Sequence, residues 1–279
     1  MATGEGMNLT DYDVILVNTS GGKDSMAMLD LIVEQATAQG VRDRVRLVHA
    51  DLRRMEWQGV RELVKEHASH YGLPLDIVTR PQGDLIDHVE SRGMWPSAKA
   101  RYCTSDHKRG QVRKVMTRLA TDWRNRWLQK DGTIDWKGPC RPCRILNCMG
   151  LRAEESRARA KRPVLSRSNA STKTTRTVDD YLPIHSWTTD EVWTRIRESG
   201  LKHHKAYDLG MPRLSCAFCI FAPKSALMVA AKHNPELLDT LCDLEKRIGH
   251  TFKVDLSLAE VRESVRQEDS PVKIENWTM

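Results

Sequence analysis

The sequence predicts an α/β protein with a doubly wound, mainly parallel sheet that carries helices on both faces. Short apolar runs rich in β-branched residues recur along the chain, and longer segments with apolar residues at helical spacing follow them. This alternation is typical of parallel sheets, because each parallel pair of strands needs a crossover connection. The 279 residues are also enough to bury a substantial core.

The first strand is expected at residues 14–17, four consecutive apolar residues that suit a strand covered on both faces. Further strands are expected at 45–51, 75–79 and 144–149. Apolar spacing, capping residues and glycine stops indicate the helices. These are expected at 25–35, 57–71, 84–92, after Thr104 or Ser105, after Thr188, at 223–233, at 235–248 and after Ser257.

Composition limits the classes of partner and location. The net charge of +7 and the pI of about 9.1 favour an anionic partner, without choosing between a nucleotide and a nucleic acid. No apolar run approaches the roughly 20 residues of a membrane span, and no signal sequence is evident, so we expect a cytoplasmic protein without a membrane partner. Seven cysteines in such a chain indicate metal, cluster or redox chemistry in preference to disulfides.

The segment Ser20-Gly-Gly-Lys-Asp-Ser25 lies between the first strand and the first helix. Its glycines let backbone N–H groups approach an anion, the helix start adds positive potential, and Lys23 adds a full charge. The spacing is not that of a Walker loop. The alternative is an ordinary glycine turn, but the strand–turn–helix context favours an anion site.

This hexapeptide resembles the phosphate loop of the ATP pyrophosphatase (PP-loop) enzymes, which hold ATP, release pyrophosphate and leave an adenylated substrate. The resemblance implies that Lys23 stabilises the departing pyrophosphate and that Asp24 helps to hold Mg²⁺. The implied ATP-binding residues are Ser20, Gly21, Gly22, Lys23, Asp24 and Ser25.

Asp51 is expected at the carboxyl end of the second strand, at the edge where open α/β sheets bind ligands. It either hydrogen-bonds a ribose or remains a solvated loop charge.

Two other segments of the sequence also have two interpretations. Tryptophans among cations at 121–142 suit single-stranded nucleic acid, although packing onto the core is the favoured interpretation. The polar, basic segment 152–176 is expected to be a mobile loop, either a solvated charge run or, as the favoured interpretation, a loop that closes over ATP or a polyanionic substrate.

The cysteines form a second group of candidate residues. Cys216–Cys219 and Cys140–Cys143 each have the Cys-x-x-Cys spacing that lets two thiolates bind one metal. Cys103 and Cys148 stand alone, and Cys242 falls on an apolar helix face as a core thiol. An iron–sulfur cluster, a zinc ion and a redox-active pair all remain open.

Over most of residues 14–220 the chain is similar to the phosphoadenosine/adenosine phosphosulfate reductase family. This resemblance implies an adenine nucleotide alpha-hydrolase-like domain at 12–205, with the insertion near 121–142, and a Cys-x-x-Cys segment with a small helical extension at 206–279. It also implies roles for Gly150 in nucleotide binding and for Arg152 and Arg157 in binding phosphate. The matching segments are Arg101–Lys108, Gly150–Arg152 with Arg157, Leu182–Trp187 with Val192–Trp193, and Tyr207–Gly210 ahead of Cys216–Cys219.

In cluster-bearing members of this family, a Cys-Cys pair and a later Cys-x-x-Cys ligate a 4Fe–4S cluster. Here Tyr102 replaces one cysteine of the first pair, and Cys148 is expected to supply the missing ligand. Cys140 and Cys143 are the rival donors, and zinc is the alternative metal. The implied ligand set is Cys103, Cys148, Cys216 and Cys219.

Two departures from the reductases proper shape the expected activity. The phosphate loop is intact, and no cysteine follows Cys242 to act as the tail nucleophile. The chain therefore resembles more closely the PP-loop enzymes that add sulfur to nucleic acid. The expected function is ATP-dependent adenylation of DNA or tRNA for sulfur incorporation, with a sulfur donor such as a cysteine desulfurase. The alternatives are a phosphosulfate reductase and a zinc-containing ATP sensor that binds nucleic acid.

Overall fold

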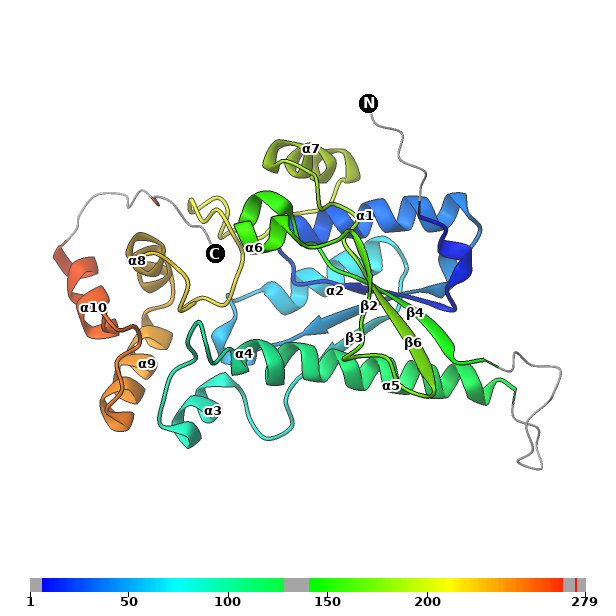
Figure 1. The fold of residues 1–279 in the computed structure, drawn as a ribbon. Helices are drawn as coiled ribbons and strands as arrows, with labels where there is room; N and C mark the ends of the chain where they lie inside the picture. Colours follow the sequence, from blue (N-terminus) through cyan, green and yellow to red (C-terminus); the bar gives the residue numbers. More distant parts are fainter. Residues whose placement is uncertain (1–6, 128–140, 268–273, 275–279) are drawn as a thin grey trace.

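The computed structural model describes residues 7–127, 141–267 and 274. A six-stranded sheet in the order β3-β2-β1-β4-β6-β5 forms its centre (Figure 1). Every neighbouring pair of strands is parallel except β5 and β6, so the predicted α/β class with a mainly parallel sheet is confirmed. The strands are β1 (Val14–Asn18), β2 (Val45–Ala50), β3 (Leu75–Val78), β4 (Cys143–Cys148), β5 (Leu165–Arg167) and β6 (Arg176–Tyr181).

Helices cover both faces of the sheet (Figure 1). Alternate residues of β1 point to opposite faces, as the pleat requires. Ile15 and Val17 pack in one core with α1, α2 and α7, whereas Val14 and Leu16 pack in another core with α5. Both sides of β1 are therefore apolar. The covering helices are α1 (Lys23–Ala38), α2 (Val60–His70), α5 (Gly110–Asn125) and α7 (Thr189–Ser199).

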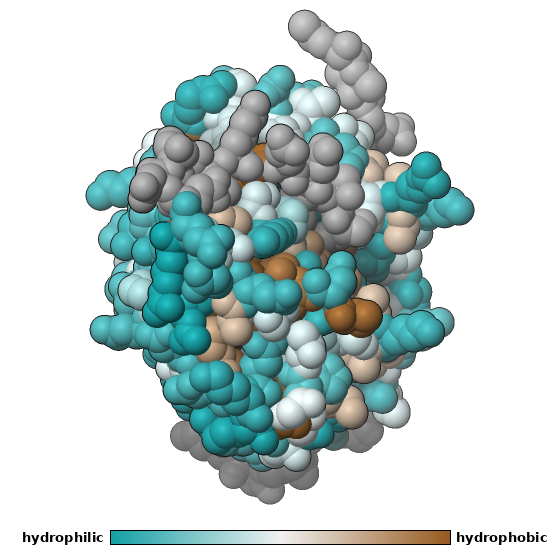
Figure 2. All heavy atoms as spheres, turned by 90° about the vertical axis from the view of Figure 1, so that its left-hand side faces the viewer, coloured by the Kyte–Doolittle hydropathy of each residue, from teal (hydrophilic) through white to brown (hydrophobic). Residues whose placement is uncertain are grey.

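The last part of the chain contributes helices that share a third core with α2 and α3 (Leu85–Arg92). They cluster on one side of the molecule, at the left of Figure 1. The face of the molecule on that side is largely hydrophilic, with small separate hydrophobic areas (Figure 2). These helices are α8 (Lys224–His233), α9 (Pro235–Ile248) and α10 (Leu258–Gln267).

Several predicted helix starts are confirmed by their caps. Asp84 and Thr188 both form capping boxes, and the Ser257 side chain accepts from the Glu260 N–H. The predicted start at Thr104 or Ser105 is wrong, because the backbone there is already helical. Instead α4 (Tyr102–Thr104) continues through a π-helical turn, η4 (Ser105–Arg109), into α5.

The prediction of a loop across 152–176 is also wrong in part. That segment contains a short helix α6 (Arg157–Ala160), the edge strand β5 and the start of β6. The polar sequence gave no strand pattern here, because β5 lies at the edge of the sheet with Leu165 and Arg167 exposed. The remaining short helical turns are η1 (Leu9–Asp11), η2 (Arg42–Arg44), η3 (Arg53–Met55) and η5 (Ala153–Glu155).

In the predicted insertion, Trp123 is buried in α5, as the favoured packing interpretation requires, and Arg141 stacks over its ring at 5.3 Å. Residues 128–140, including Trp136 and Cys140, lie outside the described part of the chain. None of the helices in the described ranges combines the length and the apolar content needed to cross a membrane.

Candidate active site

The candidate active site lies where the strand order reverses, between β1 and β4. The connections from these two strands lead toward opposite edges of the sheet, which leaves an opening at their carboxyl ends. Ser20–Ser25 follows β1, Asp51 follows β2 and Gly150–Arg152 follows β4. The topology therefore brings three of the predicted site segments to one edge of the sheet.

The phosphate loop is held in shape by its own serines. Gly21 has a φ of +70°, a conformation that favours glycine, and Gly22 caps α1, which begins at Lys23. The Ser25 hydroxyl donates to the Gly22 carbonyl at 2.8 Å and accepts from the Ser20 N–H at 3.1 Å. The loop is thus preorganised at the start of a helix, the arrangement that binds anions.

Cations from two segments converge on Asp24. Lys23 Nζ lies 3.3 Å from one carboxylate oxygen and donates to the Pro212 carbonyl at 3.0 Å. Arg152 Nε donates to the other oxygen at 2.5 Å. Burial lowers the pKa of Lys23, while the carboxylate of Asp24 opposes that shift. The predicted residues Lys23, Asp24 and Arg152 therefore form one buried network.

The backbone at Gly150 lies so close to the first turn of α1 that there is no room for a side chain. A Cβ atom on this residue would lie 2.8 Å from the Asp24 carbonyl oxygen and 3.1 Å from the Ser25 nitrogen. The segment after β4 therefore packs directly on the first turn of α1. This contact positions Arg152 beside Asp24.

A second ion-pair network extends the first, and sequence reasoning missed it. The Glu155 side chain is 6% exposed, pairs with both Arg159 and Arg213, and accepts from the Arg152 N–H at 2.9 Å. Burial lowers the pKa of Arg213, an effect that Glu155 opposes. The presence of Arg213 directly before the Cys-x-x-Cys segment was the available signal. Arg157 lies exposed at the start of α6, and its proposed phosphate contact stays a prediction.

Asp51 does not have the surroundings of a solvated loop charge. Its side chain is 5% exposed, and its two oxygens accept from the Arg53 N–H at 2.6 Å and from Arg61 at 2.9 Å. The solvated interpretation is therefore wrong, whereas the ribose contact stays a prediction. Next to Asp51 lie His49 and Glu56, which sequence reasoning did not select.

Three of the four predicted thiol ligands come together. The Cys216 and Cys219 side chains interact directly, and Cys103 is near enough for its charge to affect Cys216. The hydrogen bond from Cys216 lowers the pKa of Cys219, and the positive charges of Lys108 and Arg213 add to this effect. These interactions favour the thiolate form of Cys219.

The thiols adjoin the phosphate loop. The Tyr207 hydroxyl accepts from the Lys23 N–H at 2.7 Å and from the Leu214 N–H at 3.3 Å. The Ala217 N–H donates to the Met55 carbonyl at 2.8 Å, which ties the cysteine segment to the chain after β2. The nucleotide loop and the thiols thus belong to one connected region.

Cys148 does not join the other thiols. It is fully buried beside Val17 and Tyr181 in the core on the α1 face, and burial raises its pKa. Cys143 begins the same strand at its other end, where burial raises its pKa to about 12. The prediction of Cys148 as fourth ligand is therefore not supported, because its side chain fills the core. Within the described ranges, three of the four predicted ligands therefore stay candidates: Cys103, Cys216 and Cys219.

The spacing of these three sulfur atoms can be compared with the spacing in a tetrahedral zinc site. Tetrahedral zinc holds thiolates at about 2.3 Å, which places neighbouring sulfurs about 3.8 Å apart. In the part of the chain that the structure describes, the three sulfurs do not all lie within 4.8 Å of one another. The sulfurs of Cys216 and Cys219 are close enough to interact, whereas the three thiols together do not form a compact tetrahedral zinc site.

Comparison with known proteins gives three kinds of similarity. The sequence profile of the phosphoadenosine phosphosulfate reductase domain matches residues 14–222. An uncharacterized 37.8 kDa protein of Escherichia phage 186 is 28% identical over 173 residues, which are 62% of this chain and 46% of that relative. The match thus spans about half the length of the phage protein.

Similar solved structures include a phosphoadenylyl-sulfate reductase from Candida auris in a phosphate complex, at TM-score 0.48 and 16% identity over 75% of this chain and 83% of that one. The U34-tRNA thiolase NcsA from Methanococcus maripaludis, with its [4Fe-4S] cluster, has TM-score 0.42 and 16% identity over 94% and 74%. A Candida glabrata FMN adenylyltransferase has TM-score 0.49 and 12% identity over 76% and 57%. Since the reductase domain profile covers most of the sequence, this chain belongs to the phosphoadenosine phosphosulfate reductase family.

Proposed function

We propose that this protein is an ATP pyrophosphatase-type enzyme that adenylates an acceptor and releases pyrophosphate. The observation that carries the proposal is the serine-braced loop Ser20–Ser25 at the switch point of the sheet, with Lys23 and Arg152 converging beside it. Preorganised donors aimed at developing charge are usually the largest contribution to catalysis. Membership of a family of enzymes agrees with this proposal.

Each charged group has a role in this proposal. Lys23 moves from Asp24 to the β- and γ-phosphates and stabilises the departing pyrophosphate. Arg152 binds the α-phosphate through its planar fork, and Glu155 keeps the backbone of Arg152 in place. Asp24 is the carboxylate that holds Mg²⁺, which neutralises charge and orients the triphosphate.

The three thiols extend the proposal to sulfur chemistry. Cys103, Cys216 and Cys219 would hold a 4Fe–4S cluster, whose chemistry is the handling of sulfur. The lowered pKa of Cys219 supports thiolate ligation at this site. Their connection to the phosphate loop through Tyr207 supports one shared active site.

The acceptor in this proposal is a nucleic acid, either DNA or tRNA, with sulfur supplied by a donor such as a cysteine desulfurase. Basic side chains in the segment after β4 support a polyanionic acceptor, because Arg157, Lys161 and Arg162 are exposed. A cytoplasmic location is proposed because all six cysteines in the described ranges are free thiols. The second candidate function is phosphosulfate reduction with a thiol from another protein, which family membership favours.

Pyrophosphate release from ATP tests the proposed function. Anaerobically purified protein with Mg²⁺, ATP and DNA or tRNA as acceptor should release pyrophosphate, and Lys23→Ala should lower that rate about 100-fold or more, because the main cation of the loop is lost. The matched control is Lys65→Ala, which removes an exposed lysine of α2 and should leave the rate unchanged. Sulfite release from a phosphosulfate without pyrophosphate release would replace the proposal with the reductase. Equal rates for Lys23→Ala and the unaltered chain would contradict the role of the loop.

A further inference from the structure

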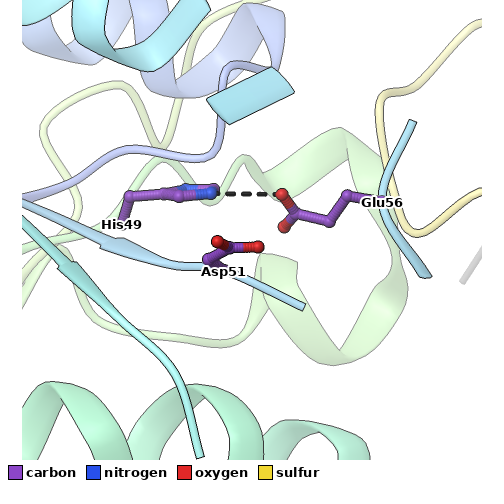
Figure 3. A group of neighbouring side chains, drawn as sticks. All are labelled: His49, Asp51 and Glu56. Carbon is purple, nitrogen blue, oxygen red and sulfur yellow. Dashed lines mark hydrogen bonds and ion pairs between the residues drawn. The ribbon is translucent and has the colours of Figure 1, made fainter. Parts of the chain in front are cut away.

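His49, Asp51 and Glu56 form a compact group of potential metal ligands at the carboxyl end of β2. Each offers one ligand atom, and these atoms lie within 4.8 Å of one another. Figure 3 shows the His49 ring and the Glu56 carboxylate facing each other, with the Asp51 carboxylate beside the line that joins them. Their side chains are 1%, 5% and 14% exposed for His49, Asp51 and Glu56 respectively.

The hydrogen bonds of His49 fix which ring nitrogen carries a proton. Nδ1 lies 3.0 Å from the Thr19 carbonyl oxygen, which can only accept, so Nδ1 donates. In the neutral ring, the lone pair of Nε2 then faces the Glu56 oxygen at 3.2 Å. Two acceptors meet here, and a shared cation must lie between them. A histidine that donates to a backbone carbonyl through its other nitrogen is the usual form of a metal-ligating histidine.

The shared cation is either a proton or a metal ion, and the geometry favours a metal ion. Ligand atoms about 2.1 Å from a tetrahedral or octahedral ion lie about 2.9–3.4 Å apart, which includes the 3.2 Å separation of Nε2 and Glu56. A proton on His49 would bond to Glu56 alone, with Asp51 contributing only its charge. A metal ion would instead take one ligand atom from each of the three side chains, whose ligand atoms already lie within 4.8 Å of one another.

Asp51 is already oriented for this role. One oxygen accepts from the Arg53 N–H at 2.6 Å, a bond that a ligating carboxylate retains. The other oxygen accepts from Arg61, whose side chain is 50% exposed and free to move into solvent. A metal ion would replace that exposed cation at Asp51.

We propose that His49, Asp51 and Glu56 bind a divalent first-row transition metal ion, separate from the thiol site and without the need for nucleotide. One imidazole nitrogen and two carboxylates favour ions such as Mn²⁺ over the all-oxygen preference of Mg²⁺. This assignment gives Asp51 a ligand role in place of the ribose contact. Because His49 also binds the carbonyl of Thr19, directly before the phosphate loop, the ion would brace the edge of the nucleotide site.

Mn²⁺ binding to the full-length protein, freed of metal by chelation, tests the site. The unaltered chain should bind one Mn²⁺ by equilibrium dialysis without ATP, and pulsed electron paramagnetic resonance should show coupling to an imidazole nitrogen. Glu56→Gln should weaken binding about 10-fold or more, and His49→Gln should remove the nitrogen coupling.

Two control variants locate the ion. His203→Gln alters an exposed histidine that lies 2.7 Å from Asp208, and it should leave Mn²⁺ binding and the nitrogen coupling unchanged. Asp43→Asn removes an exposed carboxylate and should also leave nucleotide-free binding unchanged. Absence of Mn²⁺ binding to the unaltered chain would overturn the proposal, and so would equal binding by Glu56→Gln. The nitrogen signal of the unaltered protein provides a readout that does not depend on the folding of any variant.

Discussion

Asp24 joins two cations that come from parts of the chain far apart in sequence. Lys23 is its neighbour, whereas Arg152 reaches it from the segment after β4. The sequence predicted all three residues, because a hexapeptide and a short family segment contained them. Glu155 and Arg213 were not predicted, because their ion pair joins residues 58 positions apart and no local sequence pattern indicates it.

Among the cysteines, too, local spacing predicted some positions correctly and failed for others. Spacing predicted Cys216 and Cys219 together, and they do interact. The assignment of Cys148 depended on its position next to a predicted loop, and burial in the core contradicts it. Whether a strand-end side chain points to the edge or into the core depends on register, and the sequence did not define that register well enough.

Substitution of single cysteines should separate the ligands from the core thiol. Cys219→Ser should lower the iron content of anaerobically purified protein to less than about half, because serine is a poor ligand for a cluster. Cys148→Ala is the matched variant and should retain the iron, while it lowers the free energy of unfolding by about 1 kcal/mol through a small cavity. Iron analysis and denaturant unfolding measure the two effects. Loss of iron in Cys148→Ala, with normal iron in Cys219→Ser, would reverse the assignment.

At the scale of elements, the contact between the β4 loop and α1 sets the geometry of the site. Gly150 leaves room for the first turn of α1, and a methyl group there would meet backbone, which cannot move aside as a side chain can. The position of Arg152 beside Asp24 depends on this contact. A glycine needed for close approach, without a positive φ, is recognisable only once both elements are placed.

Gly150→Ala should therefore disturb the phosphate loop. The added Cβ would lie 2.8 Å from the Asp24 carbonyl, so α1 and the loop after β4 must separate. We expect pyrophosphate release to fall about 10-fold or more and unfolding free energy to fall by about 1–3 kcal/mol. Gly40→Ala is the control: it has open space and a φ of +68°, so it should cost about 1 kcal/mol without slowing turnover. Similar turnover for both variants would contradict the close-contact role.

The predicted elements succeeded where the pattern was apolar and failed where it was polar. β1, β2 and β4 carry buried apolar residues and β3 carries partly buried ones, and all four were predicted within a residue or two of their bounds. β5 and β6 were missed, since β6 carries Thr177, Asp179 and Asp180 at partly exposed positions near the sheet edge. The π-helical turn before α5 was also missed, because it has no sequence signal of its own.

At the scale of the whole molecule, a buried histidine pair links stability to pH. His88 Nδ1 and His107 Nε2 lie 3.0 Å apart, between α3 and the turn η4. Burial, together with the neighbouring His88 and Arg80, lowers the pKa of His107 to about 4. The folded protein therefore binds fewer protons here than the unfolded chain.

Stability should fall as the pH decreases. Above about pH 6.5 both states leave His107 neutral, and stability is fully present; between about 6.5 and 4 the unfolded state takes up the proton first. We expect a loss of about 2–3 kcal/mol from this pair across that range, measured by urea unfolding. His107→Asn should flatten the pH profile, whereas substitution of the exposed His70 by asparagine should not. An unchanged slope in His107→Asn would show that other groups control acid unfolding.

The class of the fold and its family were predictable because they depend on a few local patterns that recur along the chain. The packing of the C-terminal helices against α2 and α3 was not predictable. It depends on a shared core whose members lie far apart in the sequence. The expected division at residues 205 and 206 stays a prediction. The same shared core holds the cysteine segment near the phosphate loop.

The central pairing of the sheet has a consequence for biosynthesis. Val14 of β1 aligns with Ile145 of β4, so the middle strand lacks one neighbour until more than half of the polypeptide has left the ribosome. During that interval an apolar strand edge stays open to other nascent chains. Assistance from a chaperone during synthesis should therefore raise the yield of active protein, whereas slower translation before β4 should lower it.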